Sequence, residues 1–288
     1  MKPPPFDYIA ATSVDHAVAL LAEDGDQRVV AGGQSLLPIL NLRLGGPDRL
    51  VDIGRIPELA TIEVRAGSGG DDTLLLGANV THSQLLSDDR VRDGWPLVAA
   101  AVAEIGHPAI RNRGTVGGSL AHNDPQAELP AVMLALGASV VARSPNGERR
   151  IGAAELFDGP FATVLDPDEI LIAVEVPRLA RGWSFRELAL RPGDFALAGV
   201  VVTAAPASSR VVLFGVGPGP VSADAVGRAL DAALAAGSFD PDAVVAVVTE
   251  TVADLDPPDD AHGSASARRR IVTHLLNEAT VEAWERAQ

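Results

Sequence analysis

The sequence predicts an α+β protein built from two units. Over the first 176 residues, short strand-like runs alternate with helix-like segments, whereas from about residue 177 three strand-like runs come first and three helices follow. A run of strands followed by a run of helices is typical of a separate α+β unit. We therefore place a boundary at 177–182 and expect an N-terminal domain over residues 1–176 and a C-terminal domain over residues 177–288.

Local signals mark the individual elements. Ser13 is a good N-cap for a helix that ends near Glu23, and Thr81 is a good N-cap for a later one. Asn146-Gly147 lies between two strand-like runs and predicts a β-hairpin. Further strands are expected at 28–33, 49–53, 60–67, 73–80, 169–177, 184–191, 196–205 and 210–217, and further helices at 35–44, 96–106, 128–138, 222–236, 241–254 and 264–286.

Two glycine pairs are the most informative motifs. Gly32-Gly33 follows the strand-like run that ends at Val30, and Gly117-Gly118 likewise leads into a helix-like stretch. Backbone N–H groups without partners can converge on an anion at such a turn. No P-loop lysine lies between the two turns, so we expect one ligand with two phosphates, held by the main chain. A tight turn without a ligand is the alternative for each pair alone.

The composition excludes several classes of protein. The chain has 23 Lys+Arg and 38 Asp+Glu, and its net charge of −15 repels nucleic acids and anionic lipid surfaces. No apolar stretch approaches the ~20 residues that span a bilayer. Without cysteine the chain can form no disulfide and hold no iron–sulfur cluster of its own. Its N-terminus lacks the apolar core of a signal peptide, so we expect a cytoplasmic protein.

Other kinds of site have weaker support in the residues. Neither glycine pair has the Gly-x-Gly-x-x-Gly spacing of a Rossmann fold. The six histidines are scattered and form no close ligand pair, so no metal site is expected. Ser35 and Ser119 lack the Gly-x-Ser-x-Gly elbow of a hydrolase.

Three segments together resemble the FAD-binding medium subunit of the molybdenum hydroxylases, the carbon monoxide dehydrogenase and xanthine dehydrogenase family. They are AGGQSLLPILNLRL at 31–44, IGHPAIRNRGTVGGSLAHNDPQAELPAVMLALGA at 105–138 and DEILIAVEVP at 168–177, and the likeness continues, more faintly at the end, through 184–200 and 263–276. The resemblance implies an FAD-binding fold of the vanillyl-alcohol-oxidase type. FAD would lie between two α+β subdomains at about 1–55 and 56–176, with a C-terminal α+β domain beside the ring.

The resemblance also implies the residues that hold FAD. The pyrophosphate would be wrapped by a turn that offers N–H and hydroxyl donors: Ala31, Gly32, Gly33, Gln34, Ser35 and Leu36. A second cradle would consist of Thr115, Gly117, Gly118 and Ser119. Glu128 would accept hydrogen bonds from hydroxyl groups of FAD; the alternative is a first-turn carboxylate that only complements the helix dipole.

Four further positions have two interpretations each. Asp124, followed by Pro125, fits either a contact with FAD or the N-cap of the next helix. Ile170 and Leu171 match the apolar pair that the family lays against the isoalloxazine, although a strand would bury them anyway. Arg186 falls where some relatives have a lysine near the flavin, and the alternative is a solvated strand arginine.

By resemblance the chain is an oxidoreductase subunit that transfers electrons. A large molybdopterin-binding subunit would oxidise a small molecule, and a small subunit with two 2Fe–2S clusters would relay the electrons. Non-covalently bound FAD in this chain would pass them to an external acceptor near the loop at 191–195, within a dimer of heterotrimers. A stand-alone FAD-dependent oxidase or dehydrogenase of a small molecule, and a non-catalytic nucleotide-binding module, are the alternatives.

Overall fold

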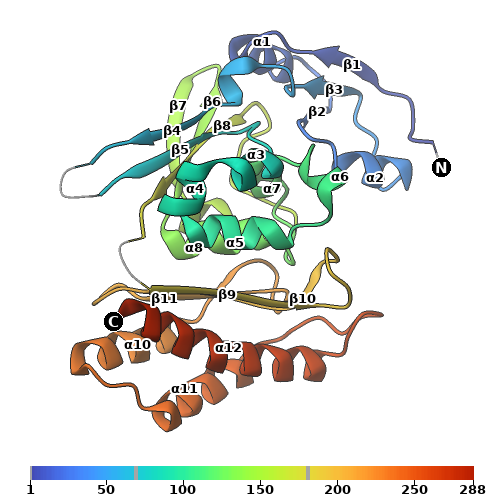
Figure 1. Ribbon diagram of the computed structural model, residues 1–288. Coiled ribbons are helices and arrows are strands. Elements are labelled where there is room, and N and C mark those ends of the chain that lie inside the picture. The colour runs from blue at the N-terminus through green and yellow to red at the C-terminus, as the bar shows by residue number, and fades with distance from the viewer. Residues whose placement is uncertain (1, 68–70, 180–181) are drawn as a thin grey trace.

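The computed structural model describes residues 2–67, 71–179 and 182–288, which contain three sheets in succession along the chain. Figure 1 shows these sheets with the helices that cover them. The predicted boundary at 177–182 includes 180–181, which lie outside the described residues. The limits of the domains and subdomains stay a prediction.

The first sheet is small and parallel. It has the order β1-β3-β2, with strands β1 (Asp7–Ala10), β2 (Gln27–Val30) and β3 (Arg49–Asp52). The hydroxyl of Ser13 accepts a hydrogen bond from the N–H of His16, so Ser13 is the N-cap of helix α1 (Val14–Leu21), as predicted. This helix packs on the sheet and forms a separate small core with it. Helix α2 (Leu36–Asn41) is shorter than predicted because Arg43 already has a positive φ.

The second sheet is antiparallel and has the order β4-β5-β8-β6-β7. Its strands are β4 (Ile62–Arg65), β5 (Thr73–Gly77), β6 (Ser139–Ser144), β7 (Gly147–Gly152) and β8 (Ile170–Pro177). The hairpin expected at Asn146-Gly147 is confirmed by the pairing of β6 with β7. Accompanying helices are η1 (Pro57–Leu59), α3 (His82–Ser87), α4 (Asp89–Gly94), α5 (Pro96–Glu104), α6 (Pro108–Arg111), α7 (Val116–His122), α8 (Glu128–Leu136) and α9 (Ala153–Leu156).

The third sheet is antiparallel and covered on both faces. Its order is β12-β11-β10-β9, with β9 (Gly182–Ala189), β10 (Ala196–Ala204), β11 (Arg210–Phe214) and β12 (Val221–Ser222). Helices α10 (Asp224–Ala236), α11 (Pro241–Ala253) and α12 (Ala265–Ala287) cover one face, while α5 and α8 pack on the other (Figure 1). Every residue of β10 is buried as a result. The three helices lie within two residues of their predicted bounds.

The main core connects the second and third sheets. It contains Leu129 and Met133 of α8, Val174 of β8, and Val212 and Phe214 of β11. Helix α8 therefore lies between the two sheets, in contact with β8 of the second sheet and with β10 and β11 of the third.

None of the helices in the described ranges is long and apolar enough to cross a membrane.

One arginine ties the third sheet to its last helix. Arg268, in the first turn of α12, is fully buried and donates hydrogen bonds from Nη1 to the carbonyl oxygens of Leu197 at 2.5 Å and Gly215 at 3.0 Å. Its Nη2 forms an ion pair with Asp260 at 2.8 Å. The guanidinium thus satisfies two buried acceptors and holds the loop that precedes α12.

The substitution Arg268→Met should lower the free energy of unfolding by about 2 kcal/mol or more, because each buried acceptor left without a partner costs about 1–3 kcal/mol. Urea unfolding followed by circular dichroism measures this change. Arg270→Met, at an exposed position two residues further on, is the matched control and should change stability by less than about 0.5 kcal/mol. Equal losses in both variants would contradict the role given to Arg268.

Candidate functional site

A cavity of about 780 Å³ lies where the three sheets meet. Its walls come from segments far apart in the sequence, which include the first glycine turn at 31–36, the second at 114–119, the stretch 161–171 and the β9–β10 turn at 193–195. Cofactor and ligand sites commonly have volumes of roughly 300–1,000 Å³. The cavity is therefore large enough for a cofactor, and every predicted site residue except Arg186 lines it.

The first glycine turn packs directly against the segment that precedes the second. A Cβ atom on Gly32 would lie 2.0 Å from the carbonyl oxygen of Arg113, so no larger residue fits without a shift of the backbone. Gly33 has a φ of +72°, in the left-handed region that favours glycine. Both glycines are thus required by the geometry, and the two turns belong to one site.

The backbone donors of the first turn have no partners within the described residues. The N–H groups from Gly32 to Leu36 form no hydrogen bond with any of them, although the next, that of Leu37, donates to the carbonyl of Gly33 at 3.2 Å. Buried or half-buried N–H groups need an acceptor. Five consecutive donors beside a cavity are suited to an anionic group, as the sequence predicted.

The expectation of free backbone donors at the second turn is wrong. The N–H groups of Val116 and Gly117 donate to the carbonyls of Val80 and Ala78, both at 2.9 Å. The N–H of Gly118 donates to the Thr115 hydroxyl at 3.1 Å, and that of Ser119 to the Thr115 carbonyl at 3.0 Å. Carbonyls of the segment that follows β5 and the cap of α7 therefore accept from these donors.

Side-chain hydroxyls remain as donors at the second turn. Thr115 and Ser119 both line the cavity. His82, which no sequence motif marks, has a buried side chain that also lines the cavity. Its Nε2 lies 3.2 Å from the Ser119 Oγ. Only the tertiary contact of α3 with α7 reveals this pair, since a single histidine after a capping threonine carries no signal of its own.

Two carboxylates lie on the cavity wall beyond the second turn. Asp124 Oδ1 accepts the N–H of Gln126 at 2.9 Å, while the N-cap of α8 is Ala127, so the alternative of Asp124 as N-cap is wrong. Glu128 is the first residue of α8 and is 5% exposed. Burial, together with the negative charges of Asp124 and Glu104, raises the pKa of Glu128 to about 7.

An apolar wall and an open rim complete the cavity. Ile170 and Leu171, at the start of β8, are buried and face it. Phe195 and Gly193 lie at its rim, where the Phe195 ring is 57% exposed. The stretch before β8 also supplies Phe161, whose ring contacts His122 at 5.2 Å between centroids. Phe161 is not predictable from the sequence, because this loop has no regular pattern.

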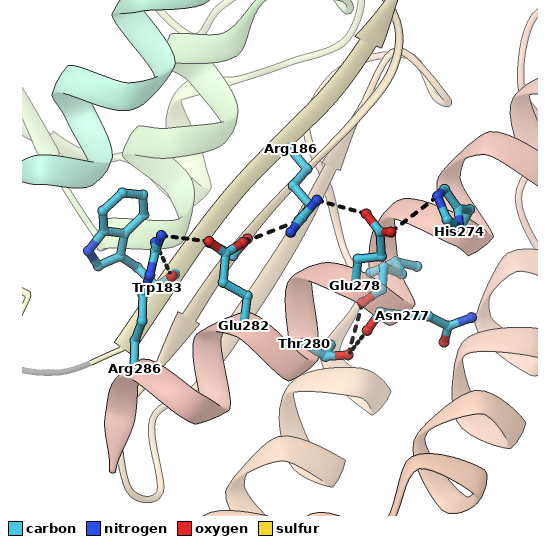
Figure 2. A network of polar contacts seen from close by, with 10 residues as sticks. Trp183, Arg186, His274, Asn277, Glu278, Thr280, Glu282 and Arg286 are labelled. Atoms are coloured by element: carbon cyan, nitrogen blue, oxygen red, sulfur yellow. Dashed lines mark hydrogen bonds and ion pairs between the residues drawn. The ribbon is translucent and has the colours of Figure 1, made fainter.

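The prediction that Arg186 lies beside the ligand is corrected by the structure. Side chains alternate along a strand, and on β9 Phe185 faces the main core while Arg186 faces α12. Arg186 is 2.7 Å from Glu278 and 3.2 Å from Glu282, in a network that continues to His274 and Arg286 (Figure 2). Arg186 is therefore a structural cation between β9 and α12.

The site can hold an anionic, elongated ligand and offers no metal centre. No group of three or more potential metal ligands occurs within the described residues. The free N–H groups suit a diphosphate, the carboxylates of Asp124 and Glu128 can accept hydrogen bonds from hydroxyl groups, and the apolar wall suits a flat ring. Arg113 is not among the residues that line the cavity, and its Nε donates to the Gly32 carbonyl at 3.3 Å.

Known proteins match this chain over its whole length. Residues 4–179 match the family described as the FAD binding domain in molybdopterin dehydrogenase. The 6-hydroxypseudooxynicotine dehydrogenase complex subunit alpha of Paenarthrobacter nicotinovorans is 40% identical over 100% of this chain and 97% of its own length. The carbon monoxide dehydrogenase medium chain of Hydrogenophaga pseudoflava is 36% identical over 99% of each.

Solved structures agree with the sequence comparison. A chain of carbon monoxide dehydrogenase from Hydrogenophaga pseudoflava superposes with a TM-score of 0.92 at 36% identity, and covers 100% of both chains. A chain of quinoline 2-oxidoreductase from Pseudomonas putida 86 superposes with a TM-score of 0.89 at 34% identity, over 100% of this chain and 99% of that one. The α+β fold with an FAD-binding domain is thereby confirmed.

A carboxylate on β9, that of Glu187, makes the stability of the folded chain depend on pH. Glu187 of β9 has a buried Oε2 without a partner among the described residues, and burial, with the charges of Glu128 and Glu104, raises the pKa of Glu187 from 4.5 to about 8. Between these values the folded chain holds a proton that the unfolded chain releases. The contribution of Glu187 to the free energy of unfolding must therefore fall as the pH rises through this range.

We expect the variant Glu187→Gln to lose less stability than the wild type when the pH is raised from 5 to 8, because glutamine does not ionise. Urea unfolding at both pH values measures this difference. Glu285→Gln, an exposed position on α12, is the control and should follow the wild type. A Glu187→Gln variant with the same pH dependence as the wild type would show that Glu187 titrates normally.

Proposed function

This chain belongs to the FAD-binding medium subunits of the molybdenum hydroxylases, and on that premise we propose that it passes electrons from a partner's 2Fe–2S clusters through FAD to an external acceptor. The chain is an oxidoreductase subunit. When bound, FAD supplies the chemistry of accepting and releasing electrons. The residues of this chain bind FAD, orient it and control what reaches it.

The observation that carries the proposal is the row of free N–H groups from Gly32 to Leu36. In an acidic chain, a diphosphate is best held by such short-range partial charges. The clash that a Cβ on Gly32 would make with the Arg113 carbonyl shows that this turn packs directly against the segment before the second turn. Ala31 to Leu36 would therefore hold the pyrophosphate, with hydroxyl groups of Thr115 and Ser119 as further donors.

The remaining walls suit the other parts of FAD. Asp124 and Glu128 would accept hydrogen bonds from its hydroxyl groups. Because the pKa of Glu128 is about 7, hydrogen bonds donated to its carboxylate would favour the ionised form near neutral pH. Ile170 and Leu171 would pack on the isoalloxazine. The exposed Phe195 at the rim is placed where an acceptor could approach. All of these proposed contacts with FAD are non-covalent.

The absence of cysteine from this chain indicates that its electrons must come from a partner subunit. The chain contains no cysteine and so holds no iron–sulfur cluster. The relatives include one named as a medium subunit of nicotine 6-hydroxylase, which supports a large molybdopterin-binding subunit and a small iron–sulfur subunit as partners here. We further propose a dimer of such heterotrimers, working in the cytoplasm without nucleic acid or an integral membrane segment.

Co-expression with the neighbouring reading frames should yield a complex of three chain types that contains FAD and reduces an external acceptor. In the same complex carrying Gly32→Ala, we expect loss of FAD and of acceptor reduction, while substrate still reduces the iron–sulfur clusters in stopped-flow absorbance traces. Gly94→Ala, where a Cβ meets no atom within 4 Å, is the control and should keep FAD.

One result would overturn the proposal. If the lone chain, reconstituted with FAD, oxidises an organic substrate at about 1 per second or faster, it is a stand-alone oxidase. Acceptor reduction by a complex that has lost FAD would equally exclude the proposed electron route.

A further inference from the structure

The contact between His82 and Ser119 decides which way a hydroxyl proton of the FAD site points. Both residues line the cavity, and Nε2 of His82 lies 3.2 Å from the Ser119 Oγ. A hydroxyl has one proton to donate. If Ser119 donates it to the imidazole, none is left for a ligand. If the imidazole donates to Ser119, the hydroxyl proton is free for an anion.

Hydroxyl groups matter at the second glycine turn because its backbone N–H groups already donate to acceptors within the protein and cannot bind a ligand. The N–H groups from Val116 to Ser119 all have partners within the protein. Thr115 shows the useful arrangement: its Oγ1 accepts the N–H of Gly118 at 3.1 Å, and no described residue accepts its own proton. A second hydroxyl arranged in the same way would double the donors on this side of the cavity.

His82 is neutral at physiological pH. Its side chain is 3% exposed, and burial lowers its pKa to about 4, with a smaller contribution from the charge of Arg111, against the opposing effect of the Thr115 carbonyl. Only one ring nitrogen therefore carries a proton. The ring is also confined, because a Cβ on Gly114 would lie 2.9 Å from its Nδ1 and Cε1.

The surroundings of Nδ1 indicate which nitrogen carries the proton. Nδ1 is buried and has no acceptor in hydrogen-bond geometry among the described residues, the Thr115 carbonyl included. Buried N–H donors without an acceptor are rarer than acceptors without a donor. A proton on Nε2, which has the Ser119 Oγ as its partner, leaves only an unpaired acceptor at Nδ1.

We propose that His82 is a positioning residue whose Nε2–H donates to Ser119 and so turns the Ser119 hydroxyl proton outward, toward a phosphate oxygen of FAD. This inference rests on the proposed function, since it needs FAD as the ligand. It assigns to the second glycine turn a pair of hydroxyl donors, Thr115 and Ser119, each held from behind by an N–H group. The anion is then bound by backbone donors on one side and by hydroxyl donors on the other.

The tautomer is tested first, in the wild-type chain without ligand. Nitrogen-15 NMR of labelled histidine distinguishes a protonated Nε2 from a protonated Nδ1. We expect His82 to carry its proton on Nε2 at pH 7. A proton on Nδ1 would overturn the proposal whatever the affinity for FAD, so this measurement does not depend on the proposed function.

Variants then test the link to FAD. His82→Leu removes the donor and should weaken FAD binding about 10- to 100-fold, the range for losing a hydrogen bond to a charged group. His82→Gln can place an amide N–H near the position of Nε2 and should restore most of the affinity. In a Ser119→Ala background, His82→Leu should have no further effect. Ser83→Ala, on the same helix but bonded to Asn112, is the control and should bind FAD normally.

Phosphorus-31 NMR of bound FAD provides a readout that a purely structural role of His82 would not change. The pyrophosphate signals should shift alike in His82→Leu and Ser119→Ala and stay near the wild type in His82→Gln. Additive losses of affinity in the double variant, or unshifted signals in His82→Leu, would overturn the proposal. If the wild-type chain binds no FAD at all, the proposed function fails instead, and the tautomer still decides the arrangement of His82.

Discussion

Five consecutive N–H groups without an acceptor are the constraint on which the site depends. The N–H groups from Gly32 to Leu36 bond to no described residue, and position 32 must be glycine because a Cβ there would lie 2.0 Å from the carbonyl oxygen of Arg113. These donors need an acceptor from outside the chain, which solvent or a bound ligand can supply. The position of the turn, at the end of a parallel strand and in front of a helix, places them at the junction of all three sheets.

The electrostatics of the molecule explain why the main chain performs this task. A net charge of −15 opposes the approach of an anion, yet partial charges on N–H groups act over only a few ångströms and are little affected by distant carboxylates. Arginines near the turns contact protein acceptors: Arg111 donates to the carbonyls of Ile105 and Gly106. Beyond the second turn, the half-buried Asp124 and the buried Glu128 line the cavity instead.

Local features were predictable from the sequence, and features that depend on a distant partner were not. The cap at Ser13 and the hairpin at Asn146-Gly147 depend on neighbouring residues, and both are confirmed. The glycine turns were recognised from their pattern, but the bond from the Gly117 N–H to the Ala78 carbonyl depends on a segment about 40 residues earlier in the chain, after β5. The direction of Arg186 likewise depends on glutamates of the last helix, which no local pattern reveals.

Residue-resolved hydrogen exchange, with and without FAD, tests the central claim most directly. In the ligand-free chain we expect fast exchange of the amides from Gly32 to Leu36 and slow exchange of those from Val116 to Ser119, which are bonded within the protein. Saturation with FAD should slow exchange in the first group and leave the second almost unchanged. Unchanged exchange from Gly32 to Leu36 in the fully loaded chain would show that the first turn does not hold the pyrophosphate.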